Sequence, residues 1–138
     1  MKFLVDTCVW SLALRRRNAS RMSPEERRLV SDLRDGIQVS NAAIIGPVRQ
    51  EVLSGIRDRA QFTKTQGLLE PFADEAMIPE DFVEAARLFN VCQDHGVVCG
   101  AVDILICAVA ARLEYGILTN DSGLARCAEV LRTEGILL

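Results

Sequence analysis

Short runs of consecutive apolar residues alternate with helical segments along this chain, and this alternation limits the fold more than any other feature. The first run, Phe3–Val5, has no polar residue between its members, as expected for a strand buried on both faces. The runs "IQVS", "ILT" and "ILL" are further strand candidates, and "EAMI" is a weaker one. Strands that alternate with helices are typical of an α/β domain with a parallel sheet, here of about four to five strands.

Capping residues mark the ends of the expected helices. Ser23, Pro24 and Glu26 form a capping-box pattern that predicts a helix start, and Gly36 predicts the end of that helix. The segment "PEDFVEAARLFNVCQDHG" has acids in its first turn and predicts an amphipathic helix that ends near Gly96. The segment "AVDILICAVAARLEYG" is apolar almost all round, which predicts a central, buried helix. The remaining expected helices cover residues 44–56, 58–70 and 122–133.

The length and composition are those of one globular domain. The chain has 138 residues, of which 49% are hydrophobic and 25% charged, so we expect a single domain over residues 1–138. The first apolar run is too short for a signal peptide, and the longest apolar segment is too short to span a membrane. We therefore expect a soluble, cytoplasmic protein without a membrane partner.

The net charge of −3 gives the molecule as a whole no attraction to nucleic acid, so any such contact needs a local basic patch. Arginines crowd into residues 15–28, and a charge run of this kind is most often a solvated surface. It could instead contact RNA phosphates or a partner protein. The residues concerned are Arg15, Arg16, Arg17, Arg21, Arg27 and Arg28.

Five cysteines are present, and neither their number nor their spacing indicates a disulfide framework or a C-x-x-C redox site. Cys92, His95 and Cys99 could approach one another as zinc ligands, but Gly96 interrupts this segment and the sequence offers no convincing fourth ligand nearby. The preferred interpretation is that the cysteines are small apolar residues in a reducing compartment.

Four acidic residues stand where the predicted fold would bring them together. Asp6 follows the first strand, Asp121 follows "ILT", and Asp103 lies in the opening turn of the almost wholly apolar helix. Glu51 lies in a helix beside an apolar stripe. Each alone could be a helix cap or a solvated residue, but the carboxyl ends of parallel strands share one edge, where ligands bind. Carboxylates gathered there repel one another, and a hard divalent cation such as Mg²⁺ or Mn²⁺ removes the conflict.

The stretches that carry these acids resemble the PIN domain family, and within it the VapC-type ribonuclease toxins of bacterial toxin–antitoxin pairs. The resemblance extends nearly end to end and rests on "LVDTCVW", "RQEVLSGI" and "VDILICAVAARLEYGILTND". Many relatives carry a further acid and an aromatic residue after "TND", where this chain has Ser122, Gly123 and Leu124. The resemblance therefore extends to four acids and leaves a fifth in question.

The resemblance implies a three-layer α/β/α PIN-like fold and an Mg²⁺-dependent endoribonuclease that acts as a toxin. Asp6, Asp103 and Asp121 would bind Mg²⁺, with Mn²⁺ as a possible substitute, and Glu51 would bind metal or orient the attacking water. All four acids would then be catalytic residues. The expected partners are an RNA substrate, a cognate VapB-like antitoxin and a second copy of the chain in a homodimer.

Polar residues beside the first and last acids are weaker candidates for substrate binding. Thr7 and Thr119 match hydroxyl residues that the family often has there, and with Asn120 they would position a ligand water or a phosphate.

Several alternative functions stay open at this point. A phosphatase that used Asp6 as its nucleophile would need a second acid two residues later, where this chain has Cys8. A PIN nuclease of RNA maturation, or a degenerate PIN domain that only binds RNA or protein, would share the same fold. The presence of all four acids favours a nuclease, and the small single domain favours the toxin.

Overall fold

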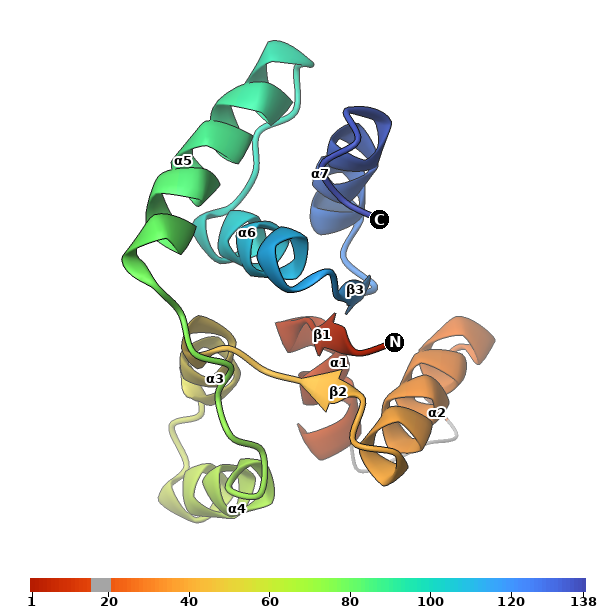
Figure 1. Ribbon diagram of the computed structural model, residues 1–138. Helices are drawn as coiled ribbons and strands as arrows, with labels where there is room; N and C mark the ends of the chain where they lie inside the picture. The colour runs from red at the N-terminus through yellow and green to blue at the C-terminus, as the bar shows by residue number, and fades with distance from the viewer. Residues whose placement is uncertain (16–20) are drawn as a thin grey trace.

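The structure is a computed structural model that describes residues 1–15 and 21–138, and for Arg15 it describes the backbone alone. A parallel sheet in the strand order β2-β1-β3 lies at its centre, and helices surround it (Figure 1). The elements are β1 (Phe3–Val5), α1 (Thr7–Arg15), α2 (Pro24–Gln38), β2 (Ala42–Ala43), α3 (Gly46–Leu53), α4 (Arg59–Leu69), α5 (Pro79–Asp94), α6 (Ala101–Leu113), β3 (Gly116–Leu118) and α7 (Ser122–Thr133).

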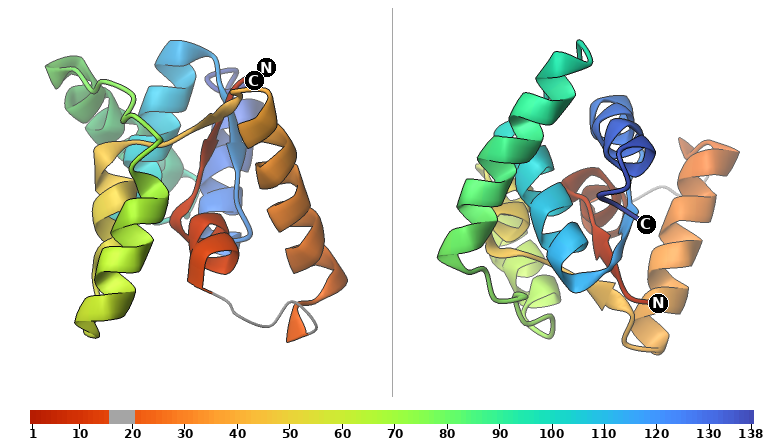
Figure 2. Two further views of the ribbon diagram at one scale, coloured as in Figure 1. Left: turned by 90° about the horizontal axis from the view of Figure 1, so that it is seen from below. Right: turned by 45° about the horizontal axis from the view of Figure 1, so that its top comes forward.

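The central strand β1 positions the rest of the sheet. Leu4 pairs with Ala43 of β2 on one side and with Ile117 of β3 on the other. Leu4 and Val5 are each 1% exposed, as expected for a strand covered on both faces. The helices α2 and α7 lie on one side of the strands and α3 and α6 on the other (Figure 2). The predicted α/β fold with a parallel sheet is therefore confirmed, with three strands among the described residues.

Two of the predicted strands are not formed: the residues of the first lie partly in a helix, and those of the second fold back onto one. The segment "IQVS" begins inside α2, and the second strand forms later, at Ala42–Ala43. Gly36 lies within α2 instead of ending it. The position has no room for a side chain, because a Cβ there would lie 2.4 Å from the ring of Phe3. This glycine therefore lets α2 approach β1 closely. At the C-terminus, "ILL" folds back onto α7, where the Leu137 N–H donates to the Leu131 carbonyl (3.2 Å).

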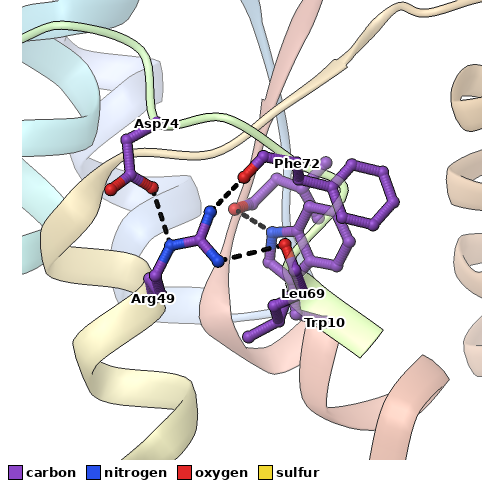
Figure 3. Close-up of polar contacts among 6 residues, drawn as sticks. Trp10, Arg49, Leu69, Phe72 and Asp74 are labelled. Carbon is purple, nitrogen blue, oxygen red and sulfur yellow. Dashed lines mark hydrogen bonds and ion pairs between the residues drawn. The ribbon is translucent and has the colours of Figure 1, made fainter. Parts of the chain in front are cut away.

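The weak strand prediction at "EAMI" is also not fulfilled, although the chain approaches the sheet just before it. Ile44 and Asp74 form an isolated parallel bridge that continues the direction of β2. Arg49 of α3 fixes this segment, because its guanidinium donates to the Leu69 carbonyl (3.0 Å), the Phe72 carbonyl and Asp74 Oδ1 (2.9 Å) (Figure 3). The segment from Leu69 to Asp74 is thereby held over the buried Trp10, whose ring lies 5.0 Å from that of Phe72.

The helix ends agree better with the sequence than the strands do. The Glu26 N–H donates to Ser23 Oγ (3.1 Å) and the Ser23 N–H to Glu26 Oε1 (3.0 Å), which confirms the capping box. The apolar helix α6 ends at Glu114, which has a φ of 58°, and not at Gly116. Gly116 instead begins β3, where its N–H donates to the Lys2 carbonyl (3.0 Å). Among the described helices, none is both long and apolar enough to cross a bilayer.

A disulfide joins Cys99, in the loop before α6, to Cys127 of α7, with 6.2 Å between the Cα atoms. The expectation that the cysteines form no disulfide is therefore wrong for this pair. The spacing of 28 residues carries no recognisable motif, and the two residues meet only because α6 and α7 pack together. Cys92 and Cys107 are buried free thiols, and Cys8 is partly buried.

Candidate active site

Asp6 is the buried centre of the candidate site. It directly follows β1, and its N–H donates to the Leu118 carbonyl of β3 (2.9 Å), so the pairing of the two strands continues to this residue. The side chain is only 4% exposed. Its Oδ1 accepts the Thr7 N–H (2.7 Å), and its Oδ2 accepts the Thr119 hydroxyl (2.8 Å). These bonds fix the position of the carboxylate and satisfy its oxygens in a buried place.

Thr119 connects the first and the last acid. While its hydroxyl donates to Asp6, the same oxygen accepts the N–H of Asp121 (2.9 Å). Asp121 is exposed and caps α7, because its Oδ2 accepts the Leu124 N–H (2.8 Å). The alternative in which Asp121 is an N-cap is therefore confirmed as a structural role, and it places the residue beside the edge of the sheet where Asp6 lies.

Thr7 makes the corresponding connection to α3. Its hydroxyl donates to Glu51 Oε1 (2.5 Å), which orients the exposed Glu51 carboxylate toward the start of α1. Thr7 thus touches Asp6 through its backbone N–H and Glu51 through its side chain. In the structure both threonines that the sequence analysis assigned to substrate binding hold acids in place.

Asp103 completes the set from the first turn of α6, where it is partly buried. Its pKa is raised to about 6, first by burial and then by the negative charges of Asp6, Asp121 and Glu51. All four acids therefore lie within electrostatic reach of one another, although they come from four different segments of the chain. The absence of a side chain at Gly100 leaves room for Asp103, whose Oδ2 would lie 3.3 Å from a Cβ there.

The charges of the four acids are not balanced by ion pairs in the part of the chain that the structure describes. The ion pairs found there join other residues, namely Arg49–Asp74, Arg87–Glu84, His95–Glu134, Arg112–Asp81 and Arg132–Glu129. Carboxylate oxygens that no cation among the described residues neutralises fit a hard divalent ion such as Mg²⁺ or Mn²⁺.

The spacing of the carboxylates also bears on how an ion would be held. Among the described residues, no three of the four acids have oxygens that all lie within 4.8 Å of one another. Mg²⁺ commonly keeps several of its waters and binds to only one or two carboxylates directly. The donor set therefore fits an ion that is held in part through water.

Cys8 is a member of the site that the sequence analysis did not include. Its thiol donates to Asp6 Oδ2 (3.4 Å), lies 3.7 Å from the Thr119 hydroxyl, and accepts the Asn120 N–H (3.3 Å). Burial is the main cause that raises the pKa of this thiol, so it stays protonated and acts as a donor to Asp6. The signal in the sequence was its position two residues after Asp6 on the first turn of α1.

Two further expectations concern residues around the acids. Asn120 is exposed beside the site, and its backbone N–H donates to the Cys8 sulfur. A role of its side chain in substrate binding stays a prediction. In the arginine-rich segment, Arg21, Arg27 and Arg28 are exposed, which agrees with a solvated surface. Arg16 and Arg17 lie outside the described residues.

Comparison with known proteins agrees with this geometry. The model of one protein family, described as PIN domain, matches residues 3–130 and so includes all four acids. A comparison with curated proteins finds no significant match.

Proposed function

Since the chain belongs to the PIN domain family, we propose that it is a metal-dependent endoribonuclease that hydrolyses RNA phosphodiester bonds at its four acids. PIN domains are generally nucleases and generally use divalent metal ions. The observation that carries the proposal is the gathering of the four acids: hydrogen bonds of Thr7 and Thr119 link Asp6 to Glu51 and Asp121, and the charges of these three acids add to burial in raising the pKa of Asp103.

In the proposed mechanism, Asp6, Asp103 and Asp121 hold the ion, with Mg²⁺ as the first candidate and Mn²⁺ as the second. A bound ion supplies a water of lowered pKa and polarises the phosphoryl oxygen. Asp6 is suited to fixed binding because Thr7, Cys8 and Thr119 donate to it.

Glu51 is suited to receive the proton of the attacking water. It is exposed, and the Thr7 hydroxyl fixes one of its oxygens. Water then attacks phosphorus and its proton passes to the Glu51 carboxylate, while the bond from phosphorus to the leaving oxygen breaks and that oxygen takes up a proton from solvent. A histidine route is not supported, since His95 lies at the end of α5 and pairs with Glu134 (2.9 Å).

For the biological role we favour the toxin of a toxin–antitoxin pair, with a VapB-like antitoxin as partner and a homodimer as the assembly. The support is the complete set of four acids and the resemblance of the stretches around them to VapC-type toxins. A PIN nuclease of RNA maturation is the second candidate, and a degenerate, binding-only domain is the third. Co-expression with the product of a neighbouring antitoxin gene separates the first two, because only the toxin should need it for normal growth of the host.

Cleavage of a mixed RNA pool by the purified protein tests the activity. We expect cleavage with Mg²⁺ or Mn²⁺, its loss in EDTA, and its return when excess Mg²⁺ is added. Cleavage that persists unchanged in EDTA would contradict the metal mechanism. A folded protein that cuts none of several RNAs with either ion would support the binding-only alternative instead.

A further inference from the structure

Three buried sulfur atoms that the proposed nuclease site does not use lie close together. They belong to α5, to the loop before α6, and to α7. The Sγ atoms of Cys92, Cys99 and Cys127 all lie within 4.8 Å of one another. Cys92 and Cys127 are 0% exposed, and Cys99 is 5% exposed. The Cys99–Cys127 bond therefore lies within a cluster of three sulfur atoms.

Of these three cysteines, Cys99 is the one that lines a groove on the surface. It lines a groove of about 460 Å³ between α5 and α6, together with Phe89 and Leu105. Neither Cys92 nor Cys127 lines this groove. A small molecule that enters the groove therefore meets Cys99 first, with Cys127 directly behind it.

We propose that Cys99 and Cys127 are a redox-active pair that reacts with low-molecular-weight disulfides through the groove between α5 and α6. In the first step the Cys99 thiolate attacks the external disulfide, forms a mixed disulfide and releases one small thiol. In the second step Cys127 loses its proton and attacks the Cys99 sulfur, which forms the Cys99–Cys127 bond and releases the second small thiol. The pair gives up two electrons and two protons, and the external disulfide takes them up as two thiols.

The other buried cysteines are suited to stay outside this reaction. Burial raises the pKa of Cys92, and the pKa of Cys107 is raised to about 12, again chiefly by burial. A thiol that keeps its proton is a poor nucleophile. Cys92 also donates a weak bond to the Cys127 carbonyl (3.8 Å), which holds its side chain in place beside the pair.

The bond joins two segments that lead to acids of the candidate site. Cys99 stands four residues before Asp103, and Cys127 stands six residues after Asp121.

The disulfide should also stabilise the protein. Closing a loop of 28 residues in the unfolded chain should raise the melting temperature by about 10 °C. The inference concerns the cysteines alone and holds whether or not the protein is a nuclease.

The test starts from the reduced full-length protein, which is incubated with oxidised glutathione. We expect the free thiols to fall from five to three, the mass to fall by two hydrogen atoms, and the melting temperature to rise as stated. Cys107→Ala, which removes a buried cysteine outside the pair, should show the same loss of two thiols. Cys99→Ala should show none. Protein that keeps all its thiols and its melting temperature would overturn the proposal.

A second variant tests the order of the two steps. In Cys92→Ala/Cys127→Ala the mixed disulfide has no resolving thiol, so glutathione should stay attached at Cys99, where peptide mapping detects it. Attachment at Cys8 alone, with Cys99 unmodified, would show that the groove does not admit the reagent and would contradict the proposed route. Because this readout is a covalent mass, it does not depend on RNA cleavage.

Discussion

Asp6→Asn should lower metal-dependent RNA cleavage by at least about 100-fold, since even residues that only support metal ligands cost about 10–100-fold when they are changed. Asp6 is the most buried of the four acids, and its carboxylate receives donors from Thr7, Cys8 and Thr119. Asparagine keeps the shape of the side chain but removes the negative charge that a cation needs. Initial rates of cleavage at saturating Mg²⁺ measure the effect.

The matched control for this substitution is Asp94→Asn, which removes the charge of an exposed acid at the end of α5. It should cleave RNA at the wild-type rate. We expect Asp6→Asn to fold, because its amide oxygen can accept the Thr7 N–H while the Thr119 hydroxyl rotates to accept from the amide nitrogen, and thermal unfolding checks this. A folded Asp6→Asn protein with wild-type cleavage would assign the activity to a contaminant or to another site.

Asp81→Ala should destabilise the protein by about 3 kcal/mol, because it breaks a buried ion pair from one side. Asp81 is 2% exposed and accepts Arg112 Nε (2.7 Å), Arg112 Nη2 (2.9 Å) and the Ile78 N–H (2.9 Å). These bonds connect the start of α5 to the last turn of α6, whose first turn carries Asp103. Without Asp81, the Arg112 charge loses its partner and α5 loses its cap. Chemical denaturation measures the change.

The control is Glu84→Ala, in the same helix, which removes an exposed pair with Arg87 and should cost less than about 1 kcal/mol.

The stabilisation by Asp81 also depends on pH. Arg112 is the main cause that lowers the pKa of Asp81 below its ordinary value of 3.8, so between the folded and the unfolded pKa the unfolded chain binds more protons. The contribution is complete above the unfolded pKa and disappears as the pH falls through the folded one. An equal gap between wild type and Asp81→Ala at neutral pH and below the folded pKa would contradict this assignment.

Three of the four acids could be predicted from the sequence because they stand at positions that the backbone topology fixes, whereas Glu51 was identified through the resemblance to the PIN domain family. Asp6 and Asp121 follow strands that become neighbours in a parallel sheet, and Asp103 interrupts an apolar helix at its first turn. Such placement depends on local pattern and on the general properties of parallel sheets. The capping box at Ser23 was predictable for the same reason, since all its contacts lie within four residues.

What the sequence did not reveal depends on contacts between distant segments. Gly36 reads as a helix stop, yet its role is set by the ring of Phe3 on a neighbouring strand. Cys99 and Cys127 meet through the packing of α6 and α7, which no spacing rule encodes. Cys8 joins the site because the loop after β3 approaches the first turn of α1. The hydroxyls of Thr7 and Thr119 were identified through the resemblance to the PIN domain family, and their use as links between acids required the three-dimensional arrangement.

The most direct test of the central claim is a titration of the metal-free protein with Mn²⁺, followed by the electron paramagnetic resonance signal of the free ion. Wild-type protein should remove Mn²⁺ from solution, and Asp103→Asn should bind it at least about 10-fold more weakly. Because the substitution removes repulsion from Asp6, Glu51 and Asp121, the metal-free variant should melt no lower than wild type, which confirms that it is folded. Equal Mn²⁺ affinity in the two proteins would contradict the assignment of the four acids to a metal site.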